Sequence, residues 1–237
     1  MTALGFLCPG HFAEDDYSRI EQLLGSDVRV ELMRTDAGVG ADRTDPLGRL
    51  GTPERLAAGV QELRHAGAEA VVWASTEDSS GYGWEGAHEQ VRSLARTAGM
   101  PASSTAFAFV HAIRELGVRR VAVGAASPED VTALFAGFLR ADGIEVVAAH
   151  SARGGTGDEA EVRSLARSAD RPEAEAVLLP DTALRTAAHV PALEKELGKP
   201  VLTASQVTVW EALRLADRRV NAPELGALFT REPVVQV

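Results

Sequence analysis

Short apolar runs alternate with longer segments of helical periodicity along most of this chain. An apolar run of about four to eight residues is typical of a strand buried in a parallel sheet. Apolar residues that recur about every three or four positions indicate an amphipathic helix instead. Runs of the first kind predict strands at 4–8, 28–32, 71–73, 101–103, 121–123, 146–148, 177–179 and 200–202. Segments of the second kind predict helices at 14–24, 89–98, 106–116, 128–141, 191–197 and 206–215, with others starting near 52 and 158.

Strands that alternate with helices predict an α/β fold in which parallel sheets are flanked by helices. The order of elements in the first half of the chain recurs in the second half, after a break at Gly117. We therefore expect two similar lobes, related by a pseudo-two-fold axis, with a cleft between them. Residues 1–115 form the first predicted lobe, 116–220 the second, and 221–237 a C-terminal tail.

Polar residues follow one predicted strand in each lobe. Ser75, Thr76 and Glu77 come after the strand at 71–73, and Asp181 and Thr182 come after the strand at 177–179. Ligands of parallel sheets bind beyond the carboxyl ends of the strands, so these two segments can face one ligand from two sides. Helix capping by serine, threonine and aspartate is the competing explanation for the same residues.

The loop after the first strand contributes His11 to the predicted ligand side, because this loop also lies beyond a strand end. No two of the six histidines have metal-ligand spacing, so we expect no metal site. The dinucleotide-binding, Walker A and nucleophile-elbow motifs are also missing from the sequence. These observations predict a protein without a cofactor.

Composition narrows the possible partners and location. The formal net charge is −10 and no cluster of lysine and arginine is present, which argues against nucleic acid as a partner. No apolar run approaches the length of about 20 residues that spans a bilayer, and no signal peptide is evident. We therefore expect a cytoplasmic protein with no membrane partner, and a homo-oligomer is left open. The single cysteine, Cys8, excludes an intrachain disulfide and is expected to be a buried, inert thiol.

Several segments resemble the maleate isomerase and arylmalonate decarboxylase group of the Asp/Glu racemase superfamily. The segments 184–186, 193–201 and 206–213 are similar to the second-lobe pattern of that group, and 71–81 and 119–131 also match well. The resemblance covers most of the chain. It implies the two-lobe fold and a small-molecule ligand that carries a carbonyl or carboxylate group.

The resemblance also assigns expected roles to individual positions. Two cysteines of that group face the substrate from opposite lobes, and their positions fall on Ser75 and Asp181 here. The decarboxylases of the group retain only the second-lobe cysteine, and this chain has neither. A tyrosine that helps hold a carboxylate falls on or near Ser127, for which helix capping is the alternative. Family asparagines fall near His11 and on Ser205.

These substitutions change the expected chemistry. A free thiol titrates near pH 8.5 and can act as acid, base or nucleophile, whereas a serine hydroxyl needs an adjacent base. A carboxylate such as Asp181 is a competent base, and partial burial would raise its pKa toward a useful range. We therefore expect a one-base reaction at a carbon next to a carbonyl or carboxyl group, with Asp181 as base or acid. Ser75, Thr76 and Thr182 are the expected donors to an enolate-like oxygen.

An ionised Asp181 would repel a dicarboxylate, so we expect a substrate that is neutral, cationic or singly anionic. The leading hypothesis is an isomerase, epimerase or decarboxylase-like lyase. The alternative is a non-catalytic relative that binds a small molecule and has lost the family chemistry. A weaker hypothesis is a hydrolase or cyclase with Ser75 or Asp181 as nucleophile.

Overall fold

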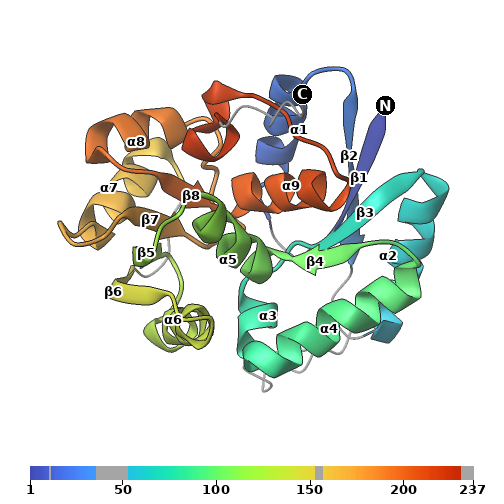
Figure 1. The fold of residues 1–237 in the computed structure, drawn as a ribbon, viewed down its shortest axis with the longest axis horizontal. Helices are drawn as coiled ribbons and strands as arrows, with labels where there is room; N and C mark the ends of the chain where they lie inside the picture. The colour runs from blue at the N-terminus through green and yellow to red at the C-terminus, as the bar shows by residue number, and fades with distance from the viewer. Residues whose placement is uncertain (11, 36–52, 153–156, 231–237) are drawn as a thin grey trace, which may run out of the picture.

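Two parallel sheets of four strands each form the framework of the protein (Figure 1). Our computed structural model describes residues 1–10, 12–35, 53–152 and 157–230. The first sheet has the order β2 (Val28–Thr35), β1 (Thr2–Pro9), β3 (Ala68–Trp73), β4 (Ala102–Ser104). The second has the order β6 (Glu145–Ser151), β5 (Arg120–Ala125), β7 (Ala176–Leu179), β8 (Val201–Thr203). The two orders are equivalent, which confirms the α/β fold with two similar lobes.

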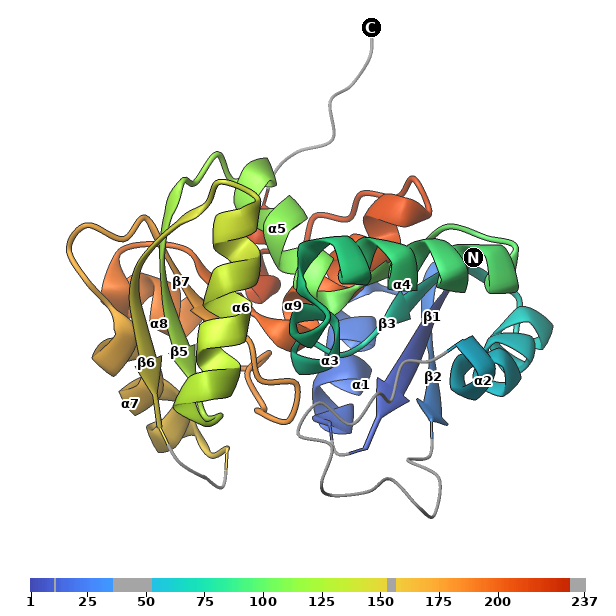
Figure 2. The same cartoon turned by 90° about the horizontal axis from the view of Figure 1, so that it is seen from below.

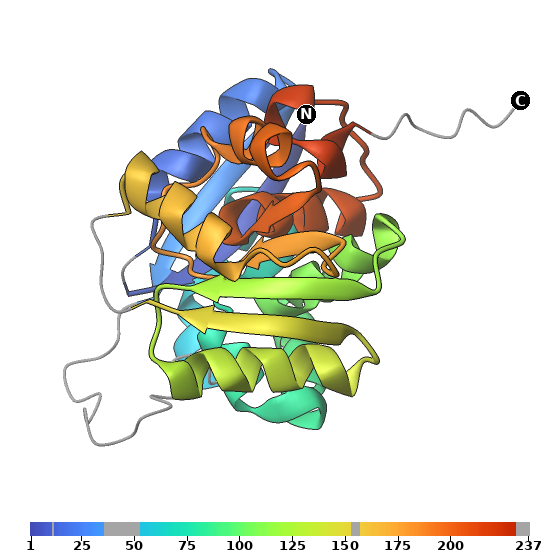
Figure 3. The ribbon, with the colours of Figure 1, turned by 90° about the vertical axis from the view of Figure 1, so that its left-hand side faces the viewer.

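Helices cover both faces of each sheet (Figures 1 and 3). In the first lobe α2 (Pro53–His65) and α4 (Gly83–Ala98) pack on one face, while α1 (Glu14–Leu24) and α9 (Ala204–Leu215) pack on the other. In the second lobe α6 (Glu129–Ala141) lies on one face, and α7 (Glu159–Ala169) and α8 (Val190–Leu197) lie on the other. The remaining elements are α3 (Glu77–Gly81), α5 (Thr105–Glu115) and the 3-10 turns η1 (Pro223–Leu225) and η2 (Ala227–Phe229). None of the helices in the described ranges is long and apolar enough to cross a membrane.

One helix was not predicted. No helix was predicted at 77–81 and the next helix was expected from 89, whereas α3 occupies 77–81 and α4 begins at Gly83. The short polar segment gave no helical periodicity, and α3 spans only five residues. Gly83 has a φ of +67°, a left-handed backbone conformation that a glycine adopts without strain, and this turn separates the two helices.

The helices α5 and α9 join the two lobes (Figures 1 and 2). Each starts where a short strand ends: the Ser104 hydroxyl accepts from the Phe107 amide, and the Gln206 side chain accepts from the Thr203 amide. The two helices pack on each other, and the hydroxyls of Thr105 and Thr208 lie 2.7 Å apart in their buried contact. One hydrophobic core extends from β1 through both helices to β5. The two lobes are therefore fused by a continuous core.

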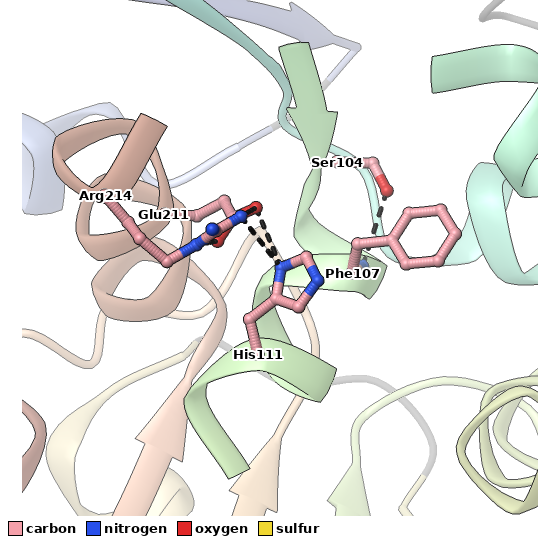
Figure 4. A network of polar contacts seen from close by, with 5 residues as sticks. All are labelled: Ser104, Phe107, His111, Glu211 and Arg214. Atoms are coloured by element: carbon pink, nitrogen blue, oxygen red, sulfur yellow. Dashed lines mark hydrogen bonds and ion pairs between the residues drawn. The ribbon is translucent and has the colours of Figure 1, made fainter. Parts of the chain in front are cut away.

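Glu211 is a fully buried carboxylate within this helix contact (Figure 4). Its Oε1 accepts hydrogen bonds from His111 Nδ1 at 2.9 Å and from Arg214 at 2.8 Å. Burial alone would raise the pKa of Glu211, but the hydrogen bonds and charges of Arg214 and His111 outweigh burial and lower that pKa to about 2. The carboxylate is therefore retained in its charged form and ties α9 to α5.

We expect Glu211→Gln to lower the free energy of unfolding at pH 7 by about 3 kcal/mol, because it removes the buried charge that Arg214 and His111 satisfy. The folded-state pKa of Glu211 lies below its usual value of 4.5, so its contribution is present above that value and is lost as the pH falls toward 2. Urea unfolding at pH 7 and at pH 3 measures both effects.

The exposed, ion-paired Glu89 provides the control variant Glu89→Gln, for which we expect a far smaller loss. Equal losses in the two variants at pH 7 would contradict a specific role for the buried carboxylate.

Candidate active site

The two polar segments that follow β3 and β7 meet at the junction of the lobes. The Thr76 hydroxyl donates to the carbonyl of Pro180 at 2.8 Å, and both residues are buried. The structure therefore brings the predicted strand ends of the two lobes into direct contact. The hydroxyl hydrogen of Thr76 is engaged in this contact, so in this arrangement Thr76 joins the segments and does not donate to a ligand.

Asp181 is held from the loop between β5 and α6. Its Oδ1 lies 2.6 Å from Ser127 Oγ, and its Oδ2 accepts a hydrogen bond of 2.9 Å from the Ala126 amide. Ser127 does not cap α6, because Pro128 occupies the N-cap position and no side chain caps the helix. The hydroxyl of Ser127 thus forms a hydrogen bond with the carboxylate of Asp181. The resemblance leads us to expect a side chain that contacts the substrate at this position.

Glu77 reaches the same hydroxyl from the first lobe. Its Oε1 lies 2.5 Å from Ser127 Oγ, while the residue itself is exposed at the start of α3. The helices α3 and α6 lie side by side across the junction of the lobes (Figure 2). Ser127 therefore connects a carboxylate of one lobe with a carboxylate of the other.

The local charges explain how Asp181 titrates. Partial burial raises the pKa of Asp181, the hydrogen bonds from Ser127 and Ala126 oppose this shift, and the nearby charge of Glu77 adds to it. The net result is a pKa above the usual value for an aspartate. Such a carboxyl group can be present in both its protonated and its ionised form closer to neutral pH, which general acid–base chemistry requires.

Ser75 occupies the equivalent strand end in the first lobe. It is buried, and its Oγ accepts a 3.2 Å hydrogen bond from the amide of Asp78 in the first turn of α3. This contact is a local bond from the backbone to a side chain near the start of α3, whose N-cap position is occupied by Thr76 without a side-chain cap bond. It uses a lone pair of the hydroxyl and leaves its hydrogen able to donate to a ligand.

Asp16 supports the loop after Asp181, and nothing in the sequence pointed to this role. This buried carboxylate accepts hydrogen bonds from the Ser205 hydroxyl at 2.8 Å and from the amides of Thr186 and Ala187 at 2.8 and 3.1 Å. The Ala13 amide also donates to the carbonyl of Thr182 at 2.9 Å. The start of α1 in the first lobe thus fixes the loop that follows Asp181 in the second. The predicted ligand contact Ser205 is part of this support.

No sequence signal distinguished Asp16 from its neighbours Glu14 and Asp15. All three are acids in the first turn of α1, where a negative charge is favourable in any helix. Only the tertiary structure shows that Asp16 is buried against the second lobe while Asp15 is exposed.

A cavity of about 220 Å³ lies beside the loop after Asp181. Its charged lining residues are paired, Arg34 with Glu14 and Arg185 with Asp15, and the Arg34 guanidinium lies 5.2 Å from the centre of the Phe12 ring. Thr182 is partly buried next to Asp181. His11 lies outside the described residues, so its predicted ligand contact stays a prediction.

Cys8 does not supply the thiol chemistry of the resembling group. It is buried in β1, and burial raises the pKa of its thiol to about 12, so the reactive thiolate is not formed near neutrality. Within the described ranges, no group of three or more histidine, cysteine, aspartate or glutamate side chains could hold a metal ion.

Two equivalent α/β lobes whose polar strand ends meet at their junction form a two-lobe fold, and a solved maleate isomerase has the same fold. The chain belongs to the arylmalonate decarboxylase family, because residues 30–229 match the model of that family. This finding confirms the resemblance seen in the sequence.

Individual relatives agree with this assignment. The chain is 30% identical to arylmalonate decarboxylase of Bordetella bronchiseptica over 203 residues, which are 81% of this chain and 84% of the relative. It is 29% identical to maleate isomerase of Geobacillus stearothermophilus over 139 residues, 55% of each protein. The structure of the maleate isomerase Iso from Pseudomonas putida S16 superimposes with a TM-score of 0.85 over 97% of this chain and 98% of the other. The two sequences are 19% identical, so this superposition shows that the two proteins share a fold and nothing more.

We expect Asp16→Asn to lower the free energy of unfolding by about 2–3 kcal/mol, because the amide replaces a buried carboxylate that accepts several hydrogen bonds. Amide hydrogen exchange at Thr186 and Ala187 should become faster, since the neutral amide oxygen of asparagine is a weaker acceptor than the carboxylate oxygen that both amides share. Urea unfolding and exchange measured by NMR test the two effects.

Asp15→Asn is the matched control, one residue away and exposed in the same helical turn. Exchange rates at 186–187 that do not change in Asp16→Asn would contradict the assigned role.

Proposed function

We propose that this protein is a cofactor-independent enzyme that transfers a proton at a carbon next to a carbonyl or carboxyl group of a small molecule. The reaction class is isomerase, epimerase or decarboxylase-like lyase, with Asp181 as the proton-transferring group. The observation that carries the proposal is the environment of Asp181: a partly buried carboxylate at a strand end, held by Ser127 and Ala126, with a raised pKa. Membership in the arylmalonate decarboxylase family supports the reaction class.

We assign the transfer of the proton and the stabilisation of the enolate oxygen to different residues of the site. As a base, the ionised Asp181 takes the proton from carbon, and the electron pair of the C–H bond forms an enolate. In a decarboxylation, the electron pair of the C–C bond forms the same enolate as carbon dioxide leaves, and the protonated Asp181 then gives its proton to carbon. Ser75, whose hydroxyl hydrogen is not engaged by Asp78, and Thr182 are the donors we assign to the enolate oxygen.

The charges at the site favour a particular kind of substrate. A substrate carboxylate placed about 4 Å from the ionised Asp181 would be repelled by about 4 kcal/mol at the effective dielectric of a protein surface. Glu77 is a second acidic group within hydrogen-bond distance of Ser127. We therefore propose a substrate that is neutral, cationic or singly anionic.

A non-catalytic binding protein is the second candidate. The observation that favours it is the loss of both family thiols, with Ser75 and Asp181 at their positions and the one cysteine buried in β1. Such a protein would use the same strand ends to bind a small carbonyl or carboxylate compound without converting it.

We expect the wild-type protein to catalyse exchange of the α-proton of a small carbonyl or carboxylate compound with deuterium, and Asp181→Asn to reduce this rate by about 10²–10⁴-fold. Thermal-shift screening of small carboxylates, amides and amino acids selects the compounds, and ¹H NMR in deuterated water measures exchange and conversion.

Ser205→Ala is a control for damage to the supporting hydrogen bonds, because Ser205 contacts Asp16. Full activity of Asp181→Asn would refute the role of Asp181. Binding without exchange or conversion would favour the non-catalytic candidate.

The stability of Asp181→Asn relative to the wild type should rise with pH. Because the folded-state pKa of Asp181 is raised, the contribution of this group to stability is lost as the pH rises through that pKa. An asparagine side chain carries no charge at any pH, so the melting temperature of Asp181→Asn relative to wild type should increase from pH 4 to pH 8. Thermal unfolding at the two pH values measures this, and a difference that stays constant or decreases with pH would contradict the raised pKa.

A further inference from the structure

The contacts of Ser127 Oγ set a requirement on the number of protons at the site. This oxygen lies 2.5 Å from Glu77 Oε1 and 2.6 Å from Asp181 Oδ1, both within the range of short hydrogen bonds between oxygens that involve an ionised group. A serine hydroxyl has one hydrogen and can donate to one of these oxygens only. The other contact needs a second proton, which a carboxyl group must supply.

We propose that Glu77, Ser127 and Asp181 form a proton relay, which holds one proton beyond that of the hydroxyl and passes it between Asp181 and the exposed Glu77. The proposal rests on the proposed function in one respect: Asp181 is the group that exchanges a proton with the substrate. It assigns to Glu77 a positioning and proton-carrying role and not a direct contact with substrate.

The relay has two arrangements of equal total charge. In one, the carboxyl of Glu77 donates to Ser127 Oγ, the serine hydroxyl donates to Asp181, and Asp181 is ionised and ready to act as a base. In the other, the carboxyl of Asp181 donates to Ser127 Oγ, the hydroxyl donates to Glu77, and Asp181 is ready to act as an acid. The shift of two hydrogens along the two contacts converts one arrangement into the other, and no charge is created.

The relay connects Asp181 to solvent. Asp181 is only partly exposed, whereas Glu77 is exposed at the start of α3. When Asp181 takes a proton from a carbon, Glu77 first releases its own proton to water. The proton of Asp181 then moves to the serine oxygen as the serine hydrogen moves to Glu77, and Asp181 is ionised again. The reverse path reloads Asp181 for protonation of an enolate, so one carboxyl group can serve as base and as acid.

The surroundings favour the shared proton. Asp78 lies next to Glu77, and its Oδ2 accepts from Trp73 Nε1 and Gln90 Nε2. Glu129 and Asp130 add acidic groups in the first turn of α6. Among the described residues, no ion pair involves Glu77 or Asp181, and a shared proton would offset the repulsion between these two carboxylates.

The test is a pH titration of the side-chain carboxyl carbons by ¹³C NMR on the full-length protein without ligand. We expect the signals of Glu77 and Asp181 to respond in the same two steps, as two strongly interacting groups do. Glu77→Gln removes the like charge and leaves Ser127 free to donate to Asp181. Asp181 should then titrate in one step, with a proton affinity at least about tenfold lower. Ser127→Ala removes the bridge, so the common two-step response should disappear.

Glu85→Gln is the control, because it removes an exposed carboxylate in the first turn of α4 and should leave the titration of Asp181 unchanged. Independent single-step titrations of Glu77 and Asp181 in the wild type, or an unchanged Asp181 in Glu77→Gln, would overturn the relay. This measurement needs no turnover, so a coupled titration in a protein that converts no compound would refute the proposed function alone. Where turnover is found, Glu77→Gln should lower kcat and shift its pH profile while KM stays unchanged.

Discussion

The packing of α5 against α9 is the constraint on which the rest of this structure depends. Each helix starts at the end of a short strand, and their contact belongs to a hydrophobic core that extends from β1 to β5. Two sheets connected only by loops would leave their strand ends free to separate. The fused core instead fixes the sheets relative to each other, so that Thr76 of one lobe can donate to the carbonyl of Pro180 in the other. The position of the site follows from the helix pair.

Buried polar groups then make this junction specific. Apolar packing tolerates small shifts between two helices, whereas a buried carboxylate requires its donors at defined positions. Glu211 meets this requirement between α5 and α9, and Asp16 meets it between α1 and the loop after Asp181. Both carboxylates receive donors from the opposite lobe or helix. A change in the relative position of the lobes would remove the hydrogen-bond donors of one of these two carboxylates. A helix of the first lobe can therefore fix the position of a loop in the second.

The sequence was sufficient to predict the architecture, because helices and strands are indicated by local, periodic patterns of apolar residues. The helix at Glu14–Leu24 was predicted to its ends, and the alternation of strands and helices predicted the two parallel sheets. Ser127, which contacts Asp181, lies 54 residues away from it in the sequence, and Ser205, which contacts Asp16, lies 189 residues away. No local sequence pattern carries information about contacts between such distant positions. Ser127 is an example of what the sequence leaves open. From the sequence, capping of α6 accounted for this serine equally well, and only the structure shows that its hydroxyl lies between two carboxylates.

Replacement of a thiol by a carboxylate changes what the neighbouring positions must do. A neutral thiol can sit beside a bound carboxylate without repulsion, whereas Asp181 adds a charge that the site must neutralise or share. The small hydroxyl of Ser127 fits between two acids in this chain. Burial raises the pKa of Asp181, and the hydrogen bond from Ser127 opposes part of that rise. Restoring a cysteine at position 181 alone would leave Ser127 and Glu77 facing a thiol, which is a poor hydrogen-bond partner.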